Sequence, residues 1–283
     1  MKKICCILFF QLFLLTASAQ DYGNNPEAGG YIPLNGINMY YESYGSGEPL
    51  LLLHGNGGSI KGHKQKIDFF KDKFRVIVMD SRGHGKTTGN NGKPLTYDQM
   101  AEDLNVLMDS LQVEDAYVWG QSDGGILGLL LAINHPEKVK RLATFGANLF
   151  PGPTALQEEL HELVVQTLST TKDAKTKQLY ALLAYQPDIS NEELQQISCP
   201  VLIMSGDRDA IKLEHSIRIF RMIPKSNLFI MPGATHFGSY EKPELFNEVL
   251  LDFFTAPFVM TSTLEKLAPK KEQHAVENSP AHQ

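Results

Sequence analysis

One pentapeptide near the middle of the chain has the residues for nucleophilic catalysis. Residues 120–124 read Gly-Gln-Ser-Asp-Gly, after an apolar run from Ala116 and before an apolar stretch that continues to Asn134. This pattern predicts a buried strand, a tight turn and a buried helix. The two glycines let the strand and the helix approach closely. Ser122 is then exposed at the turn, above the positive end of the helix, where its hydroxyl could act as a nucleophile.

A serine nucleophile needs a base that follows a late strand of the sheet. His236 lies a few residues after the apolar run 228–231 and before the last helical segment, which places it at the same sheet edge as Ser122. Other histidines fit this position less well, because His63 and His161 fall on helical stretches expected to be exposed. We therefore predict that His236 takes the proton from Ser122.

The base needs a carboxylate to orient it, and one loop offers two. Asp207 and Asp209 both follow the apolar run 201–204. Asp209 lies three residues after Gly206, where the loop turns toward His236, and is the predicted acid. Asp207 is the alternative, with a structural role as its expected one. A buried carboxylate here would fix the imidazole tautomer and stabilise the imidazolium.

Acyl transfer also needs backbone N–H groups directed at the developing negative charge. One is expected from Asp123, which follows the nucleophile. The second is expected from the glycine-rich segment after the apolar run 50–53, where Asn56, or alternatively Gly57, carries the amide. A phosphate-binding loop is the other interpretation, but no Lys-Ser or Lys-Thr pair follows the glycines. His54 and residues 80–85 are expected to brace this loop through hydrogen bonds.

Apolar strands alternate with helical segments over most of the chain, which predicts an α/β fold with a mostly parallel, doubly wound sheet. An Asn35-Gly36 turn predicts an antiparallel hairpin at its start. The predicted parallel strands are 50–53, 76–79, 117–119, 142–145, 201–204 and 228–231, and the predicted helices are 60–70, 96–111, 125–134, 213–222 and 243–254.

About residues 147–199 the alternation is interrupted by helical patterns without a clear strand. Ligands of such sheets bind at the carboxyl ends of the strands, so we interpret this insertion as a lid, with ordinary packing helices as the alternative. Its apolar side chains favour a small or medium, partly apolar substrate group; those singled out are Phe150, Leu160, Leu163, Leu179, Leu182 and Tyr185.

Taken together, these segments resemble α/β-hydrolase-fold serine hydrolases of the carboxylesterase-like superfamily. The resemblance covers roughly residues 31–255 and rests on His54-Gly55, the Asp-x-Arg-Gly-x-Gly segment at 80–85, the serine turn, the acid loop and the base segment 233–236. It implies that Ser122 is the nucleophile, Asp209 the acid and His236 the base, in the family's order. Gln121 stands where many members carry His, a departure expected to change packing but not chemistry.

The ends of the chain predict an exported protein of one domain. Lys2 and Lys3, an apolar run and an Ala-x-Ala arrangement describe a signal peptide over residues 1–19, cleaved near Ala19, with a retained anchor helix as the alternative. Residues 20–30 are expected to be a flexible leader, residues 31–256 the hydrolase domain and residues 257–283 a disordered tail. The mature protein is thus expected to be periplasmic or secreted, without stable membrane insertion.

Charge and cysteine content limit the kinds of molecule that the protein is expected to bind and the bonds it is expected to form. Without Lys2 and Lys3, the chain has 24 basic and 32 acidic residues, which gives a net charge of −8. The sequence has no stripe of basic residues, so binding to nucleic acid is not predicted. Cys199 alone remains after the signal, so no intrachain disulfide is expected. No metal or cofactor is expected, and the predicted partner is a small ester-like molecule.

The leading functional hypothesis is hydrolysis of carboxylic esters through an acyl-enzyme on Ser122. A lactonase or a C–C bond hydrolase could use the same triad, and a non-catalytic binding scaffold is a further alternative. Dehalogenases and epoxide hydrolases would need Asp at position 122 and are excluded.

Overall fold

Eight strands form one mixed sheet in the computed structural model, which describes residues 21–267. The strands are β1 (Gly29–Leu34), β2 (Ile37–Tyr44), β3 (Pro49–Leu53), β4 (Arg75–Met79), β5 (Ala116–Gln121), β6 (Val139–Phe145), β7 (Val201–Arg208) and β8 (Ser226–Thr235). Their order is β1-β2-β4-β3-β5-β6-β7-β8, with β2 antiparallel to β1 and β4 and the other pairs parallel. The predicted fold class and the predicted hairpin are confirmed.

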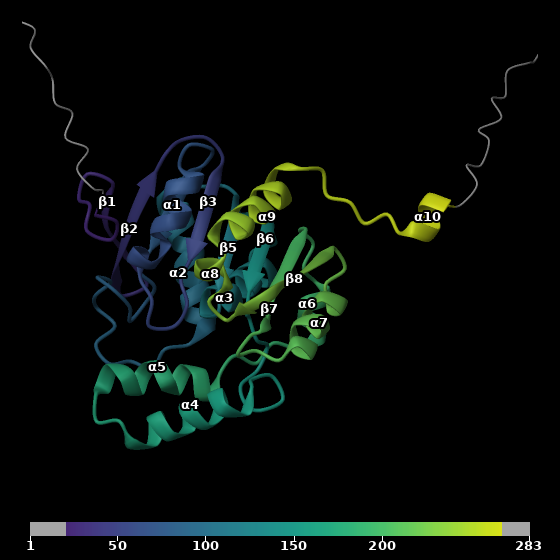
Figure 1. Cartoon of the computed structure of the whole chain (residues 1–283). Coiled ribbons are helices and arrows are strands. Elements are labelled where there is room, and N and C mark those ends of the chain that lie inside the picture. Colours follow the sequence, from purple (N-terminus) through teal and green to yellow (C-terminus); the bar gives the residue numbers. More distant parts are fainter. Residues whose placement is uncertain (1–20, 268–283) are drawn as a thin grey trace, which may run out of the picture.

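Helices connect the strands and cover both faces of the sheet (Figure 1). They are η1 (Ile60–His63), α1 (Lys64–Phe70), α2 (Tyr97–Ser110), α3 (Asp123–Asn134), η2 (Pro136–Lys138), α4 (Glu158–Thr170), α5 (Ala174–Tyr185), α6 (Asn191–Gln195), α7 (Leu213–Met222), α8 (Gly238–Glu241), α9 (Pro243–Thr255) and α10 (Thr263–Leu267). Several of these helices begin at a residue whose side chain caps the helix. The Thr96 hydroxyl accepts a hydrogen bond from the Gln99 amide at 3.2 Å, and the Asp173 carboxylate accepts one from Thr176 at 2.7 Å.

The strands are buried on both faces because alternate side chains enter two separate cores. Leu51 and Leu53 pack with apolar residues of α2, α3 and α7 on one face. Leu50 and Leu52 pack with α1 and α9 on the other face. This explains why the strands are continuous apolar runs in the sequence and do not alternate with polar residues. The rigid centre of the sheet positions the loops at its carboxyl edge.

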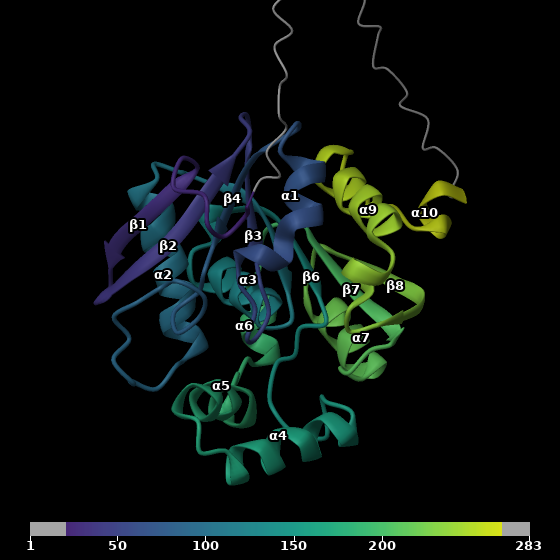
Figure 2. The same ribbon diagram turned by 60° about the vertical axis from the view of Figure 1, so that its left-hand side comes forward.

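The insertion between β6 and β7 divides into two structural parts. Helices α4 and α5 pack against each other and project from the sheet as a pair, as Figures 1 and 2 show from two directions. Helix α6 instead packs against α3 and α7, and its Leu194 is fully buried in the core. Within the predicted insertion, only α4 and α5 therefore lie over the edge of the sheet that carries the predicted site residues.

Both ends of the chain continue past the described residues. The predicted signal segment 1–19 lies outside them, as does the tail after residue 267. Within the predicted tail, the structure describes the short helix α10, all of whose residues are exposed. In residues 21–267, no helix combines the length and the apolar character that crossing a bilayer would need.

Candidate active site

Ser122 occupies the sharp turn between β5 and α3. Its backbone has φ 53° and ψ −119°, a conformation that costs energy for a residue with a side chain. The flanking glycines are required by close approach: a Cβ at Gly120 would lie 2.0 Å from the Gly124 carbonyl oxygen, and one at Gly124 would lie 2.2 Å from that of Leu53. The packing of β3, β5 and α3 thus holds the serine in its strained position.

His236 and Asp209 form a direct hydrogen bond at the carboxyl edge of the sheet. Nδ1 of His236 lies 2.6 Å from Oδ1 of Asp209. The Asp209 carboxylate is buried and also accepts hydrogen bonds from the amides of Ile211 at 3.0 Å and Gly206 at 3.3 Å. Burial alone would raise the pKa of Asp209, but the hydrogen bond and charge of His236, together with these amides, lower it below its ordinary value.

The geometry distinguishes the two carboxylates of the acid loop. Asp207 is exposed, whereas the Asp209 side chain points to the histidine. Because the Asp209 carboxylate is ionised, it holds the proton of His236 on Nδ1 and leaves Nε2 as an acceptor. Nε2 is the nitrogen that a catalytic base requires.

One residue that sequence reasoning missed makes room for this pair. Gly146 directly follows β6 and has φ 65°. A Cβ there would lie 2.6 Å from Cε1 of His236 and 3.3 Å from Oδ2 of Asp209. Its position immediately after a predicted strand, at the same sheet edge as the serine, was the available sequence signal.

The glycine-rich segment after β3 lies directly against the nucleophile. A Cβ at Gly55 would come within 3.2 Å of the Ser122 Cβ, so the backbone passes the serine closely. Asn56 is the next residue, and its side-chain Nδ2 donates to Oδ2 of Asp123 at 3.0 Å. The two residues predicted to supply oxyanion amides are therefore joined through their side chains.

His54 braces this segment, as predicted. Its Nε2 accepts a hydrogen bond from the Ser81 amide at 3.0 Å, so Nδ1 carries the proton and donates to the Gly55 carbonyl oxygen at 2.8 Å. Burial lowers the pKa of His54 to about 4, which keeps the ring neutral at physiological pH. The Asp80 carboxylate accepts hydrogen bonds from the amides of Ile60 at 2.9 Å and Lys86 at 2.7 Å.

Gln121, the residue before the nucleophile, holds the histidine loop. Its Nε2 donates to the backbone oxygen of His236 at 2.8 Å, and its Oε1 accepts from the Ser239 hydroxyl at 2.6 Å. Both Gln121 and Ser239 are buried. The departure from His noted at this position therefore creates a link between the serine turn and the base loop, beyond the expected change in packing.

A buried lysine lies behind this link. Nζ of Lys66 donates to the Ser239 carbonyl oxygen at 3.4 Å and lies 4.5 Å from the Trp119 ring centroid and 4.8 Å from that of Tyr240. Burial lowers the pKa of Lys66 to about 7.

The neighbouring His63 is also fully buried, against Trp119, so the prediction that His63 is exposed was wrong. The helical pattern did not show that this face of η1 and α1 points into the core.

Ser122 and His236 line one cavity of about 770 Å³ under α4 and α5. Its apolar wall consists of Leu160 and Leu163 of α4, Tyr180 and Leu183 of α5, and Phe237 and Tyr240 beside the histidine. Of the other insertion residues expected in this wall, Leu179 and Leu182 pack in the core, while Phe150 packs against that core and Tyr185 is exposed. Among the described residues that line the cavity, none is Lys, Arg, Asp or Glu.

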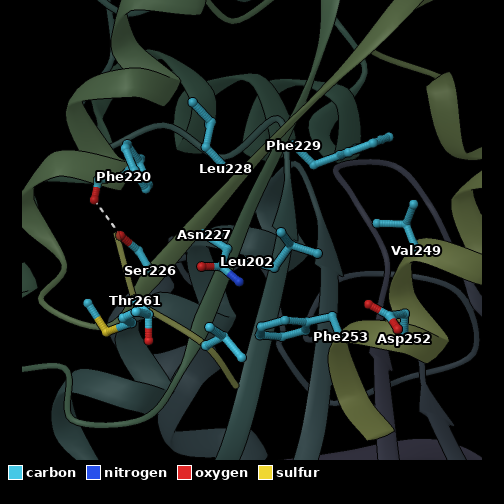
Figure 3. Close-up of a pocket in the computed structure, with 12 residues that line it drawn as sticks. Leu202, Phe220, Ser226, Asn227, Leu228, Phe229, Val249, Asp252, Phe253 and Thr261 are labelled. Atoms are coloured by element: carbon cyan, nitrogen blue, oxygen red, sulfur yellow. Dashed lines mark hydrogen bonds between the residues drawn. The ribbon is translucent and has the colours of Figure 1, made fainter. Parts of the chain in front are cut away.

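A second cavity of about 660 Å³ lies at the opposite end of β7 and β8 (Figure 3). Apolar side chains such as Leu202, Phe220 and Phe253 surround it, and Asp252 is its one charged lining residue in the described part of the chain. The Ser226 hydroxyl there donates to the Phe220 carbonyl oxygen at 2.5 Å. This second cavity holds no base beside a nucleophile among its described lining residues, so the Ser122 cavity is the one with the groups for acyl transfer.

In residues 21–267, no three His, Cys, Asp or Glu side chains gather as ligands for a metal ion.

Comparison with known proteins agrees with this fold. Residues 48–184 match the family described as alpha/beta hydrolase fold, a range that includes Ser122 and ends before Asp209 and His236. RutD of Caulobacter sp. (strain K31), to which carbamate hydrolysis is ascribed, is 28% identical over 262 residues, covering 77% of this chain and 96% of RutD. The 2-hydroxy-6-oxononadienedioate/2-hydroxy-6-oxononatrienedioate hydrolase of Paraburkholderia phymatum is 25% identical, covering 77% of this chain and 91% of the relative.

A solved structure shows the same architecture. Carboxylesterase CesB of Bacillus subtilis superposes with a TM-score of 0.69 at 21% identity, covering 81% of this chain and 92% of CesB. The chain has the alpha/beta hydrolase fold and is similar in sequence to hydrolases of differing substrates.

Proposed function

We propose that this protein hydrolyses neutral carboxylic esters through an acyl-enzyme on Ser122. The observation that carries the proposal is the hydrogen bond from His236 to the buried Asp209, at a cavity that His236 shares with Ser122, a strained and half-buried serine. Ser122 attacks the ester carbonyl while Nε2 of His236 accepts its proton. The histidine then protonates the leaving alcohol, and water, activated by the same ring, releases the acid from the serine.

The backbone amides of Asn56 and Asp123 are proposed to hold the oxyanion of the tetrahedral intermediate. Asp123 begins α3, where the positive end of the helix favours negative charge. Asn56 lies beside Gly55, whose backbone passes within contact of the serine. Gly57 is the alternative donor on the same segment, and it lines the same cavity.

The uncharged walls of the cavity support an ester that carries no charge of its own. A dianion such as the dienedioate in the relative's name would lose water on entering this cavity and would find no cationic side chain among the lining residues. The apolar wall from α4 and α5 instead suits an aliphatic or aromatic acyl or alcohol group. An uncharged lactone would meet the same wall, so a lactone panel belongs beside the ester panel.

Replacing the nucleophile tests the proposal. Ser122→Ala is expected to abolish labelling by a fluorophosphonate probe and to lower kcat for p-nitrophenyl esters by roughly 10⁴- to 10⁶-fold. Wild type should prefer neutral esters over matched esters that bear a carboxylate. Labelling that survives Ser122→Ala would reject Ser122 as the nucleophile, and equal rates on neutral and anionic esters would reject the substrate class.

We also propose that the protein is exported after cleavage near Ala19. The charged start, apolar run and Ala-x-Ala arrangement support this. Fractionation of cells that express the full chain should recover a shortened protein beginning at Gln20 outside the cytoplasm. A full-length protein that stays with the membrane would instead favour a retained anchor.

A further inference from the structure

The side chain of Asn56 connects three parts of the molecule that are far apart in sequence. Its Nδ2 donates to Oδ2 of Asp123 at the start of α3 and to the carbonyl oxygen of Leu179 in α5, at 3.0 and 3.3 Å. One amide group thus joins the glycine-rich segment to the serine turn and to a helix above the cavity. The two acceptors use both hydrogens of the amide nitrogen.

Asp123 is built as a fixed acceptor for this contact. Its side chain is only 2% exposed, and its pKa is raised to about 6 by burial, against the stabilising effects of the Tyr97 hydroxyl and the Asn56 amide. A carboxylate held in a buried site needs its donors, so losing the Asn56 side chain would leave it poorly solvated. Its position relative to Ser122 is set by the first turn of α3.

The backbone of Asn56 is the part that matters for catalysis, if the proposed function is right. The segment around it is rich in glycine and has few side chains of its own to fix it. Fixing the Asn56 side chain therefore also limits where its amide can point. The bond to Leu179 means that this restraint is complete only when α5 is in its observed place.

We propose that Asn56 is a positioning residue that couples the placement of α5 over the cavity to the assembly of the oxyanion site. With α5 in place, both Asn56 bonds form and the amide is directed at the substrate oxygen. With α5 displaced, the Leu179 bond is lost and the Asn56 side chain is held by Asp123 alone. The inference rests on the proposed acyl transfer and extends it, because it makes the oxyanion site depend on the helix that covers the substrate.

Three variants separate the two bonds. Asn56→Ala removes both. The exchange Asn56→Asp with Asp123→Asn lets the new amide at 123 donate to the new carboxylate at 56, but a carboxylate cannot donate to the Leu179 carbonyl oxygen. Gln178→Ala is the matched control, because Gln178 precedes Leu179 on the same helix and its amide donates to the Lys93 carbonyl oxygen, away from Asn56.

The measurements are the affinity for an aryl boronic acid, which forms a tetrahedral adduct on the serine, the kcat and KM for a soluble ester, and hydrogen exchange in α5. Asn56→Ala should weaken boronate binding and lower kcat by about 10-fold or more, with KM changed less than about threefold, and should speed exchange in α5. The exchanged pair should still show fast α5 exchange and incomplete recovery of boronate affinity. Gln178→Ala removes a contact of α5 that does not involve Asn56 and leaves the Asn56–Leu179 bond in place, so α5 exchange should change much less than in Asn56→Ala and boronate affinity should stay at the wild-type value.

Two results would overturn the inference. One is an Asn56→Ala protein that has wild-type boronate affinity and kcat, even if it unfolds more easily. The other is full recovery by the exchanged pair, which would show that the Asp123 bond suffices and α5 has no part. If wild type itself neither binds the boronate nor cleaves esters, the proposed function has failed instead, and that outcome is visible before any variant is made.

Discussion

The two residues that flank Ser122 each fix one side of the cavity through side-chain hydrogen bonds. The buried ionisable group on one side is a base, and on the other side it is an acid. Gln121, before the serine, bonds to the histidine loop through His236 and Ser239. Asp123, after the serine, bonds to the oxyanion segment through Asn56. Each is a buried polar side chain on an element that the sheet fixes, and each reaches a loop that the sheet does not fix. The serine turn therefore organises both loops around the nucleophile.

The charges of the two sides differ. Behind Gln121 lies Lys66, a buried amine among aromatic rings, and no carboxylate in residues 21–267 lies within ion-pair distance of it. On the other side the buried group is an acid, Asp123, whose bonded partner is the neutral Asn56 amide. Both groups are costly when ionised, so the two sides should respond to pH in opposite directions.

The largest expected effect is on the base side, at the carboxylate that orients His236. Asp209→Asn should lower kcat by about 10⁴-fold, because an amide can stabilise neither the required tautomer nor the imidazolium. Asp207→Asn, two residues earlier and exposed, is the matched control and should stay within about threefold of wild type. Steady-state kinetics on one soluble ester decides this, and the reverse ranking would transfer the acid role to Asp207.

Lys66→Met should give the largest gain in stability, and that gain should depend on pH. Its pKa is about 7 in the folded protein against an ordinary value of 10.5, so the folded protein bears the full cost of the buried charge below pH 7. As pH rises from 7 to 10.5, only the unfolded chain keeps the proton and the cost shrinks. Lys66→Met, which preserves length, should therefore raise the free energy of unfolding by about 4 kcal/mol at pH 6 and about 2 kcal/mol at pH 9. Urea unfolding at both values measures it, and an equal gain at both would contradict a buried charge.

Asp123 should show the opposite trend on the oxyanion side. Its pKa is about 6 in the folded protein against an ordinary value of 3.8, so folding loses stability as pH rises from 3.8 to 6 and stays lower above that range. Asp123→Asn, whose amide oxygen can still accept from Asn56, should gain about 3 kcal/mol at pH 7.5 but only about 1 kcal/mol at pH 4.5. The same urea titrations apply. A gain that grows toward low pH would reverse the assigned sign.

The sheet and the nucleophile turn were accessible from sequence because each depends on a local pattern. Apolar runs such as 50–53 and 201–204 fall within observed strands, and the glycines around Ser122 are short-range requirements of one turn. Parallel strands bring their carboxyl ends to one edge, so residues just after different strands could be predicted to meet. That rule brought Asp209 and His236 together without any knowledge of the side chains between them.

The side chains that support the site were not accessible in this way. Asn56 and Leu179 are 123 residues apart, and Gln121 and Ser239 are 118 apart, so no local pattern connects them. Lys66 lies on a correctly predicted helical segment, but a lysine at such a position is ordinarily solvated. Its burial follows from how α1 packs against α9 and the sheet, which is a tertiary property.

The smallest expected effect distinguishes the base side of the cavity from the oxyanion side by the leaving group of the ester. Gln121→Leu keeps the volume and removes the bonds to His236 and Ser239, so kcat should fall about 10- to 100-fold with KM nearly unchanged. Because His236 must protonate the leaving alcohol, the loss should be greater for an alkyl ester than for a p-nitrophenyl ester, whose leaving group needs no proton. Asn56→Ala, which disturbs the oxyanion side, should slow both esters by the same factor. An equal loss for both esters in Gln121→Leu would mean that Gln121 supports the turn as a whole and not the base loop in particular.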